Sequence, residues 1–369
     1  MGEDSFLYAD ELGPAKMVHL YVPGAGLKAV VAVDNTACGP AIGGVRMAPD
    51  VSAEEAFRLA RAMTLKNAAA SLPHGGGKSV IFADPQMPLP EKERLLRAFA
   101  QAIAGLTEYI PGPDMGTDEL AMGWVHDEIG RAVGLPRELG GIPLDELGAT
   151  GFGLAAAIEV ACEAIHVELR GARVAIQGFG AVGKHTARFL AQKGCVLVAC
   201  SDSRGAVGDS RGLDVSALIA LKDSGKSVVD FPNGEKAPAD AMLDVPCEIW
   251  VPAARPDVLR GDNAGRLQTR IVAQGANIPC TPEAEALLES RGVLILPDFV
   301  VNAGGVICAA TEYHGGTEAS AFASIGEKIR RNTALVIEQS RRQGISARSA
   351  ATALALERIR RAQRARRWR

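Results

Sequence analysis

The chain has 369 residues, which is longer than one hydrophobic core usually supports, so its length predicts two domains. Apolar residues make up 47% and charged residues 22%, a composition that excludes intrinsic disorder. The formal net charge of −3 gives no reason to expect nucleic acid or a membrane surface as the main partner. There is no uninterrupted apolar run of about 18 residues and no signal-peptide pattern at the N-terminus, so we expect a soluble, cytoplasmic protein.

Seven cysteines are scattered along the chain without a Cys-x-x-Cys pair, which predicts neither a disulfide framework nor a zinc site, and no metal is expected. The C-terminus is unusually basic. Its arginines are Arg358, Arg360, Arg361, Arg364, Arg366, Arg367 and Arg369. A basic tail can bind a polyanion, but we favour a solvated helix end or a contact between subunits.

The first half of the chain mixes β and α patterns. Residues 28–33 form an apolar run typical of a buried strand, and a Gly/Pro-rich stretch follows over 38–44. Ser52 and Glu55 stand at the spacing of a capping box, which predicts a helix from Ser52 towards Ala70. The other elements expected in this half are a strand over 79–84, a helix over about 90–106 and a loop over 111–117.

The second half alternates strands and helices. Residues 148–153 open an Ala-rich helix that runs to about Ala164. Further elements are expected over 173–177, 181–192, 195–201, 248–252, 270–273 and 293–296, with a last helical stretch from about 319. This alternation predicts a parallel, doubly wound sheet. We therefore expect an α/β protein with domains at 1–148 and 149–339, and with about 340–369 packing back on the first domain.

The run Gly178-Phe-Gly-Ala-Val-Gly183 fits the G-x-G-x-x-G pattern of a dinucleotide-binding turn. That pattern alone is weak, but here a strand precedes it, a helix follows it and a second strand ends at Asp202. A carboxylate there accepts hydrogen bonds from ribose hydroxyls and repels a 2′-phosphate, which favours NAD over NADP, although Arg204 weakens this preference. The alternative is a glycine turn that binds nothing. The NAD contacts expected here are Gly178, Phe179, Gly180, Ala181, Val182, Gly183, Asp202, Ser203 and Arg204.

Two lysines are hard to explain as surface residues. Lys66 falls in line with Leu59 and Met63 on the expected helix, so its ammonium group lies on the face that should be buried, where snorkelling is the ordinary outcome. Lys78 follows three glycines. A phosphate-binding P-loop would need glycine where Leu72 stands, so that motif is excluded, whereas a surface turn stays open. In a desolvated pocket, or beside a cation such as Lys66, Lys78 would have a lowered pKa and could act as a general base.

Over nearly its whole length the chain resembles the glutamate/leucine/phenylalanine/valine dehydrogenases. The matching segments, which occur in the family's order, are 39–47, 63–70, 75–79, 114–117, 148–153, 178–183, 274–277 and 301–305. The resemblance implies an N-terminal α/β substrate domain, a cleft, a Rossmann-type NAD-binding domain and a homo-oligomer. The implied reaction is reversible oxidative deamination, in which an L-amino acid, NAD⁺ and water give a 2-oxo acid, ammonium and NADH.

The resemblance also implies roles for single residues. Lys66 should bind the substrate carboxylate, and Lys78 should activate the water that attacks the iminium formed by hydride transfer. Asp114 is similar to the family's catalytic carboxylate, which exchanges protons with the substrate amine, and Asp118 is a rival for that role. Further substrate contacts are implied for Gly43, Gly44, Gly112, Asn277, Val306 and Ala309. Further cofactor contacts are implied for Thr150, Ala253, Asn277 and Asn302.

Three positions bear on the substrate's side chain. Relatives specific for glutamate place a lysine where Ile42 stands, so this apolar residue argues against glutamate. Leucine-type relatives have alanine and valine where this chain has Gly112 and Ala309, so a larger pocket and L-phenylalanine are favoured. One or two methyl groups discriminate by only about 1–3 kcal/mol, so leucine and valine stay as alternatives.

Two other classes of function fit the sequence less well. A hydroxy-acid dehydrogenase usually relies on a histidine acid/base, and neither His74 nor His126 stands in an Asp–His pattern. A catalytically silent NAD-binding regulator would not need Lys66, Lys78 and Asp114 together. An amino-acid dehydrogenase is therefore the favoured function.

Overall fold

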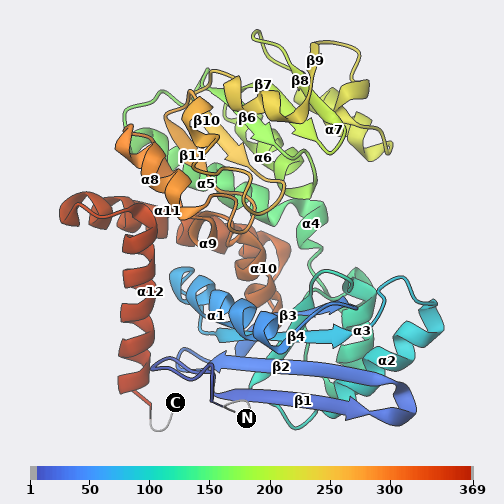
Figure 1. The fold of residues 1–369 in the computed structure, drawn as a ribbon. Coiled ribbons are helices and arrows are strands. Elements are labelled where there is room, and N and C mark those ends of the chain that lie inside the picture. The colour runs from blue at the N-terminus through green and yellow to red at the C-terminus, as the bar shows by residue number, and fades with distance from the viewer. Residues whose placement is uncertain (1–5, 367–369) are drawn as a thin grey trace. The chain divides into compact units, whose positions relative to one another are not determined.

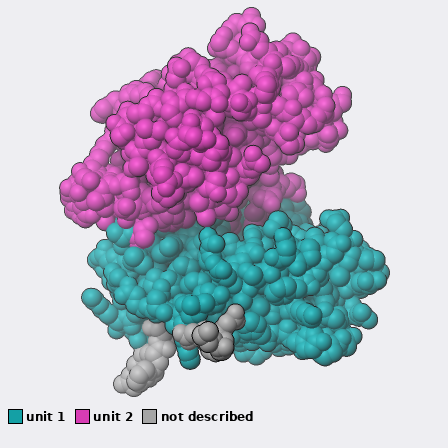
Figure 2. Space-filling view, viewed as in Figure 1, with its two compact units in different colours: residues 1–143, 306–321, 353–369 teal, residues 144–305, 322–352 magenta. Residues whose placement is uncertain are grey.

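The computed structural model describes residues 6–366, and the chain divides into two compact units (Figure 2). Unit 1 contains residues 1–143, 306–321 and 353–369, and unit 2 contains residues 144–305 and 322–352. The predicted boundaries at 148/149 and 339/340 differ from this division, which groups 306–321 with the N-terminal part of the chain. Residues 1–5, where a signal peptide would begin, lie outside the described residues, as do Arg367 and Arg369.

Unit 1 is built on a five-stranded sheet with strand order β1-β2-β4-β3-β5 (Figure 1). β1, β2 and β4 pair antiparallel, whereas β4, β3 and β5 pair parallel. The strands are β1 (Lys16–Val22), β2 (Leu27–Asn35), β3 (Ala41–Ala48), β4 (Gly75–Phe82) and β5 (Tyr109–Pro113). Its first three helices are α1 (Ala53–Ala69), α2 (Leu89–Ala102) and α3 (Glu119–Ile129). The largest core of this unit includes the buried side chains of Phe99, Tyr109 and Met122.

The glycines before Lys78 lie inside β4 and are buried, so the strand predicted over 79–84 begins earlier and the surface-turn alternative is wrong. Close packing explains why these positions are glycine. A Cβ on Gly76 would lie 2.1 Å from the backbone nitrogen of Thr64 in α1, and a Cβ on Gly75 would lie 1.7 Å from the carbonyl oxygen of Asn35 in β2. Any larger residue would push α1 or β2 away from the centre of the sheet.

α1 begins as predicted, because the Ser52 side chain accepts a hydrogen bond from the backbone N–H of Glu55 at 3.1 Å. Its buried face differs from the predicted one, since Leu59, Met63 and Lys66 are only half-buried. The buried residues are Ala56, Ala60, Thr64, Asn67 and Ala68. Small side chains occupy this face because α1 packs directly against the glycines of β4, where larger ones would not fit.

β3 and β5 were not expected as strands. β3 takes in the end of the Gly/Pro-rich stretch 38–44, and β5 contains Pro111 and Pro113 of the predicted loop 111–117. Proline lacks a backbone donor and is therefore found mainly on edge strands, and β5 is an edge strand of this sheet. The composition of both segments favours a loop. They form strands because they pair and pack with neighbouring strands, and local propensity does not predict this.

Unit 2 contains a seven-stranded sheet of order β12-β11-β10-β6-β7-β8-β9 (Figure 1). The first five strands in that order are parallel, which confirms the predicted doubly wound α/β class, and β8 and β9 add an antiparallel edge. The strands are β6 (Arg173–Gln177), β7 (Val196–Asp202), β8 (Gly205–Gly208), β9 (Glu235–Ala237), β10 (Ile249–Pro252), β11 (Ile271–Ala273) and β12 (Leu294–Leu296). The helices are α4 (Leu144–Leu147), α5 (Ala149–Ala164), α6 (Ala181–Gln192), α7 (Val215–Asp223), α8 (Pro282–Ser290) and α9 (Asp298–Val301).

Three C-terminal helices contribute to both units. They are α10 (Gly304–Tyr313), α11 (Glu318–Gln343) and α12 (Ala347–Arg364). In unit 1, the Arg358 guanidinium donates to the carbonyl oxygens of Ala68 and Leu72, at 3.1 and 2.7 Å, and Arg360 pairs with Glu11 at 2.7 Å. Part of the basic C-terminus therefore satisfies carbonyls at the end of α1. Within residues 6–366, no helix has both the length and the apolar character that a membrane crossing requires.

Candidate active site

Lys78 lies in the sheet of unit 1 with a carboxylate as its partner. Its side chain is buried, the whole residue being 6% exposed, and its Nζ lies 2.6 Å from Oδ2 of Asp114. Lys78 belongs to β4 and Asp114 directly follows β5, and β3 lies between these two strands. The structure therefore brings together two of the residues predicted to be catalytic, although 36 positions of sequence separate them.

Arg46 is a third member of this cluster, and sequence reasoning missed it. Its Nε donates to Oδ2 of Asp114 at 3.0 Å, and its Nη1 donates to Oε1 of Glu55 at 2.6 Å. Arg46 stands two positions after Gly44 on β3, so the two residues face the same side of the sheet. The alternation of side chains along a strand is the signal that could have identified Arg46, since Gly44 was already expected to line the site.

The two central groups shift each other's titration in opposite ways. Burial lowers the pKa of Lys78 below its ordinary value; Asp114 opposes this shift and the Arg46 charge adds to it. Burial by itself would raise the pKa of Asp114, but the cations Lys78 and Arg46 hold it below its ordinary value. Arg46 is therefore a cation that acts on Lys78, and the predicted effect of Lys66 on Lys78 stays a prediction.

Gly43 and Gly44 are required by the close approach of β3 to its neighbours. A Cβ on Gly43 would lie 1.5 Å from the carbonyl oxygen of Gly77. A Cβ on Gly44 would lie 2.7 Å from Cβ of Asp114 and 3.2 Å from Nζ of Lys78. Any side chain at Gly44 would therefore occupy space beside the lysine and the carboxylate. This position agrees with the expected role of Gly44 in lining a substrate site.

Asp118 and Lys66 are the other two charged residues for which the sequence predicted a catalytic role. Asp118 is exposed and caps α3, because its Oδ1 accepts a hydrogen bond from the backbone N–H of Ala121 at 2.9 Å. The structure thus gives Asp118 a role in starting a helix. Lys66 lies half-buried near the end of α1, and its binding of a substrate carboxylate stays a prediction.

The predicted specificity positions differ in the space around them. Ala309 is buried in α10, at 7% exposure, and Val306 is half-buried on the same helix. A Cβ on Gly112 would lie 2.9 Å from Cγ2 of Val133, so Val133 already fills the space that glycine leaves. The expectation that Gly112 enlarges the pocket is therefore not supported by the packing.

His74, which precedes the glycines of β4, contacts no carboxylate among the described residues. Its Nδ1 lies 3.1 Å from the carbonyl oxygen of Pro40, and its Nε2 lies 3.1 Å from Nε2 of His314. Burial lowers the pKa of His74 to about 4, which favours the neutral ring. Neither partner resembles the carboxylate that holds a catalytic histidine in an Asp–His pair.

The glycine turn of unit 2 has the geometry that a dinucleotide requires. Gly178 has a φ of 94°, and a Cβ on it would lie 2.7 Å from the backbone nitrogen of Ala254. A Cβ on Gly183 would lie 1.9 Å from the carbonyl oxygen of Gly178, so helix α6 packs closely on the turn. Gly180 faces open space and is the N-cap of α6, with no side chain capping the helix. The uncapped N–H groups are therefore available to a pyrophosphate, and these residues fit the cofactor.

Asp202 ends β7 beside this turn, as predicted. The backbone N–H groups of Gly178 and Phe179 donate to the carbonyl oxygen of Ser201, at 3.0 and 2.8 Å, which holds the turn against the end of β7. Ser203 and Arg204 follow and are exposed, as are Gly180 and Ala181. The predicted phosphate and ribose residues thus lie at the carboxyl ends of two adjacent parallel strands.

Four further residues of unit 2 were predicted to contact the cofactor or the substrate, and two of them, Asn302 and Asn277, contact each other. The buried Asn302 donates through Nδ2 to Oδ1 of the exposed Asn277, at 3.0 Å. Thr150 lies in the first turn of α5, and its Oγ1 would be 3.2 Å from a Cβ on Gly305. Ala253 is half-buried directly after β10. The structure therefore joins the two asparagines, and the roles of all four residues stay predictions.

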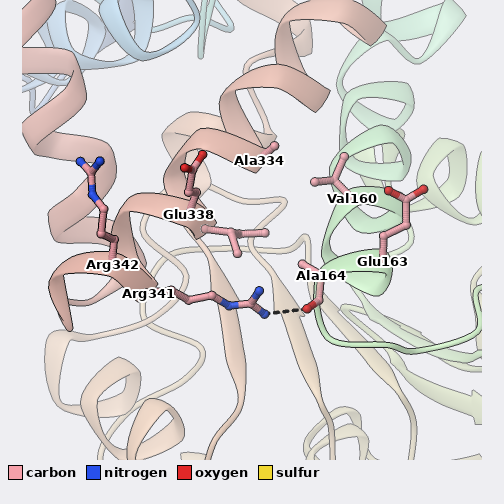
Figure 3. A pocket seen from close by; sticks show the side chains of 8 residues that line it. Val160, Glu163, Ala164, Ala334, Glu338, Arg341 and Arg342 are labelled. Carbon is pink, nitrogen blue, oxygen red and sulfur yellow. Dashed lines mark hydrogen bonds between the residues drawn. The ribbon is translucent and has the colours of Figure 1, made fainter.

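A surface hollow of about 710 Å³ in unit 2 lies away from these motifs, between α5 and α11 (Figure 3). Arg341 extends across it and donates to the carbonyl oxygen of Ala164 at 2.7 Å. Its lining combines apolar and charged side chains, namely Val160, Glu163, Ala164, Ala334, Ile337, Glu338, Arg341 and Arg342. None of these residues belongs to a motif identified in the sequence.

Two family models match the chain. The model described as glutamate/leucine/phenylalanine/valine dehydrogenase matches residues 140–367, and the model described as its dimerisation domain matches residues 14–131. A glutamate dehydrogenase of Aeropyrum pernix is 38% identical over 90% of this chain and 85% of its own length. Both halves of the chain are therefore matched, in the order that the sequence predicted.

Solved structures that share the fold include enzymes named for different substrates. The hetero-hexameric glutamate dehydrogenase of Thermus thermophilus, in its leucine-bound form, is 32% identical, with a TM-score of 0.85 over 96% of this chain and 91% of that one. The L-tryptophan dehydrogenase of Nostoc punctiforme is 28% identical, with a TM-score of 0.76 over 96% of this chain and 98% of that one. The matched relatives thus act on both acidic and aromatic amino acids.

Proposed function

The chain belongs to the glutamate/leucine/phenylalanine/valine dehydrogenase family and is an NAD-dependent amino-acid dehydrogenase, and from this premise we propose that its substrate is an apolar L-amino acid, L-phenylalanine first. The reaction is reversible oxidative deamination, here to phenylpyruvate and ammonium. Leucine and valine are the alternatives within the same family. We also propose that the enzyme works as a homo-oligomer, with its substrate and NAD sites in the two predicted domains.

The ion pair between the buried Lys78 and the half-buried Asp114 is the observation that carries the proposed chemistry. NAD⁺, when bound, would supply the acceptor for the hydride of the substrate Cα. Because burial favours the uncharged amine, Lys78 can take a proton from the water that attacks the resulting iminium. Asp114 is held ionised by Lys78 and Arg46 through one oxygen, Oδ2. Both cations contact Oδ2, and we assign Oδ1 to the exchange of a proton with the substrate amine.

An apolar substrate is supported by the environment of Ile42. This residue is 3% exposed on β3, one position before Gly43, where glutamate-specific relatives have a lysine. A buried isoleucine offers no charge to a side-chain carboxylate, and leaving such a carboxylate without a partner in a buried site is costly. The small, buried Ala309 supports a large side chain, whereas Gly112 does not, because Val133 fills its space.

The proposal is tested by a panel of L-amino acids assayed with NAD⁺, following the absorbance of NADH. We expect the highest kcat/KM for phenylalanine, with leucine and valine lower by about 10–200-fold, which is the range that one or two methyl groups can discriminate. Glutamate should be the poorest of these substrates. A highest kcat/KM for glutamate would contradict the apolar assignment. Absence of any ammonium dependence in the reverse reaction, with turnover of a hydroxy acid instead, would contradict amino-acid chemistry.

The role of Ala309 is tested by Ala309→Val, which adds two methyl groups to a buried position. We expect the ratio of kcat/KM for phenylalanine over leucine to fall by about tenfold. Gly112→Ala is not combined with it, because its Cβ would clash with Val133. An unchanged ratio in a variant of normal stability would show that Ala309 does not contact the substrate side chain.

A further inference from the structure

The carboxylate of Asp202 is held by four donors in unit 2. Its Oδ1 accepts hydrogen bonds from Oγ of Ser227 at 2.7 Å and from the backbone N–H of Arg204 at 3.0 Å. Its Oδ2 accepts from Nζ of Lys222 at 2.7 Å and from the backbone N–H of Val228 at 3.0 Å. These donors come from α7, from the turn after β7 and from the segment that follows α7.

Four donors use the whole accepting capacity of a carboxylate. An ionised aspartate has two oxygens and about four lone-pair sites, so Asp202 keeps none for a further donor. An acid that selects NAD must accept hydrogen bonds from the ribose hydroxyls, and its negative charge must repel the 2′-phosphate of NADP. Here the acceptor sites are occupied, and the ammonium of Lys222 lies against the charge. Asp202 therefore ties the turn to α7 and cannot select the ribose in the usual way.

The other charges around Asp202 come in opposite pairs. Arg204, whose side chain is 62% exposed, contacts Asp230 through Nη1 at 3.0 Å. Lys222 is 23% exposed and pairs with Asp202 itself. The two cations and two anions balance, so this end of the site carries no net negative charge to repel a phosphate. Because an exposed ion pair is weak, the Arg204 guanidinium can leave Asp230 for a stronger, doubly charged partner.

We propose that the adenosine end of the dinucleotide site also accepts a ribose 2′-phosphate, so that the enzyme binds NADP(H) as well as NAD(H). Arg204 binds the phosphate directly. Lys222 also determines the cofactor specificity, but indirectly, because it pairs with the Asp202 carboxylate that would otherwise repel the phosphate. The inference rests on the proposed position of the adenosine ribose beside Asp202.

Binding measurements on the intact enzyme test this inference without relying on turnover. Isothermal titration with NADH, NADPH, adenosine 5′-monophosphate and adenosine 2′,5′-bisphosphate gives the four dissociation constants. We expect NADPH to bind within about tenfold of NADH, which corresponds to one charge-assisted hydrogen bond lost or gained. NADPH binding more than about 100-fold weaker than NADH would overturn the inference and leave the NAD site intact. Failure of both NADH and adenosine 5′-monophosphate to bind would instead contradict the proposed cofactor site.

The chain supplies a matched control for Arg204, because the sequence Asp-Ser-Arg-Gly occurs at both 202–205 and 209–212. In the second copy, Arg211 pairs with Asp209 in a turn of the same kind, and its side chain is 89% exposed. We expect Arg204→Ala to weaken NADPH and the 2′,5′-bisphosphate by about tenfold, with little change for NADH. Arg211→Ala should change neither. Equal effects of the two substitutions would overturn the role of Arg204.

Lys222 is tested by a pair of substitutions that separate its charge from its size. Lys222→Met frees one of the two occupied acceptor sites on Oδ2 of Asp202 and removes a cation, so the preference for NADH over NADPH should rise by about tenfold or more. Lys222→Arg keeps the cation and should preserve NADPH binding. Circular dichroism and the binding of NADH confirm that both variants are folded. An unchanged preference in folded Lys222→Met would overturn the role of this lysine.

Discussion

Asp114 in unit 1 and Asp202 in unit 2 are carboxylates at the ends of parallel strands, each held by a buried or half-buried lysine, yet they differ in what is left for a ligand. Both Lys78 and Arg46 contact the same atom of Asp114, Oδ2. Both oxygens of Asp202 are occupied, by two donors each. The way the donors are distributed over the two oxygens, rather than the charge, distinguishes the carboxylate proposed to react from the structural one.

The two lysines that pair with these aspartates also differ, in how far each is buried. Lys78 is 6% exposed and burial lowers its pKa, so it can lose its proton near neutral pH more readily than an exposed lysine. The Lys222 side chain is 23% exposed and serves as a charged partner. A lysine that must move a proton is therefore the one removed from water, whereas a lysine that only neutralises an acid stays hydrated.

The largest effect is expected from Lys78→Ala. Removing the base should lower kcat for oxidative deamination by about 10²–10⁴-fold, while the dissociation constant of NADH changes little, because the cofactor residues lie in unit 2. Steady-state kinetics and NADH titration measure the two quantities. Turnover within a few-fold of the wild type would remove Lys78 from the mechanism.

A smaller but still large effect is expected from Asp114→Asn. The amide keeps the shape but cannot accept a proton, so kcat/KM should fall by about 10²-fold. Asp118→Asn is the matched control, because asparagine caps a helix about as well as aspartate and the cap of α3 should survive. If the Asp118 variant loses more activity than the Asp114 variant, the assignment of the two carboxylates is reversed.

Arg46→Gln should change the pH dependence of turnover. Without the Arg46 cation, the protonated form of Lys78 is more favoured, and Asp114 is freer to pair with it, so the pKa of Lys78 rises. Since the neutral amine is the active form, the rise of kcat/KM with pH should move to higher pH. At pH 8 the rate should fall by about tenfold. A pH–rate profile that keeps its midpoint, with an equal loss at every pH, would contradict this coupling.

The smallest effect on turnover is expected from Asp202→Asn, which should act on stability instead. The hydrogen bonds to Asp202 outweigh burial and lower its pKa from 3.8 to about 2. A lowered pKa gives stability that is present above pH 3.8 and is lost as the pH falls towards 2. We expect the variant to lose about 1–2 kcal/mol of unfolding free energy at pH 7 and the difference to shrink as the pH falls from 3.8 towards 2.

Urea unfolding at pH 7, 5 and 3 measures this difference, and Asp209→Asn, in the second Asp-Ser-Arg-Gly turn, is its control. The partner of the control carboxylate among the described residues is Arg211 of its own turn, so its loss should have a smaller effect. An Asp202 variant as stable as the wild type at pH 7 would show that the four donors do not stabilise the fold.

Local sequence patterns predicted the dinucleotide half of the protein well. β6, α6 and α5 match the expected ranges. An apolar run, a glycine turn and an amphipathic helix are each specified by residues that are neighbours in the sequence, so local patterns predict them. The same reasoning failed for β3, for β5 and for the glycines of β4. These segments are strands because of partners distant in sequence, and their composition favours loops when read alone.

The sequence by itself predicted the fold class and the family, and it selected Lys78, Asp114, Asp202 and the glycine turn as candidate site residues. Only the tertiary structure showed that Arg46 shares the oxygen of Asp114 with Lys78, that Asp118 caps a helix and that Lys222 occupies Asp202. The reason is physical. Residue types and spacings specify which chemical groups are present, but hydrogen-bond saturation and desolvation depend on which groups meet in space, and these two properties decide what each charged residue can do.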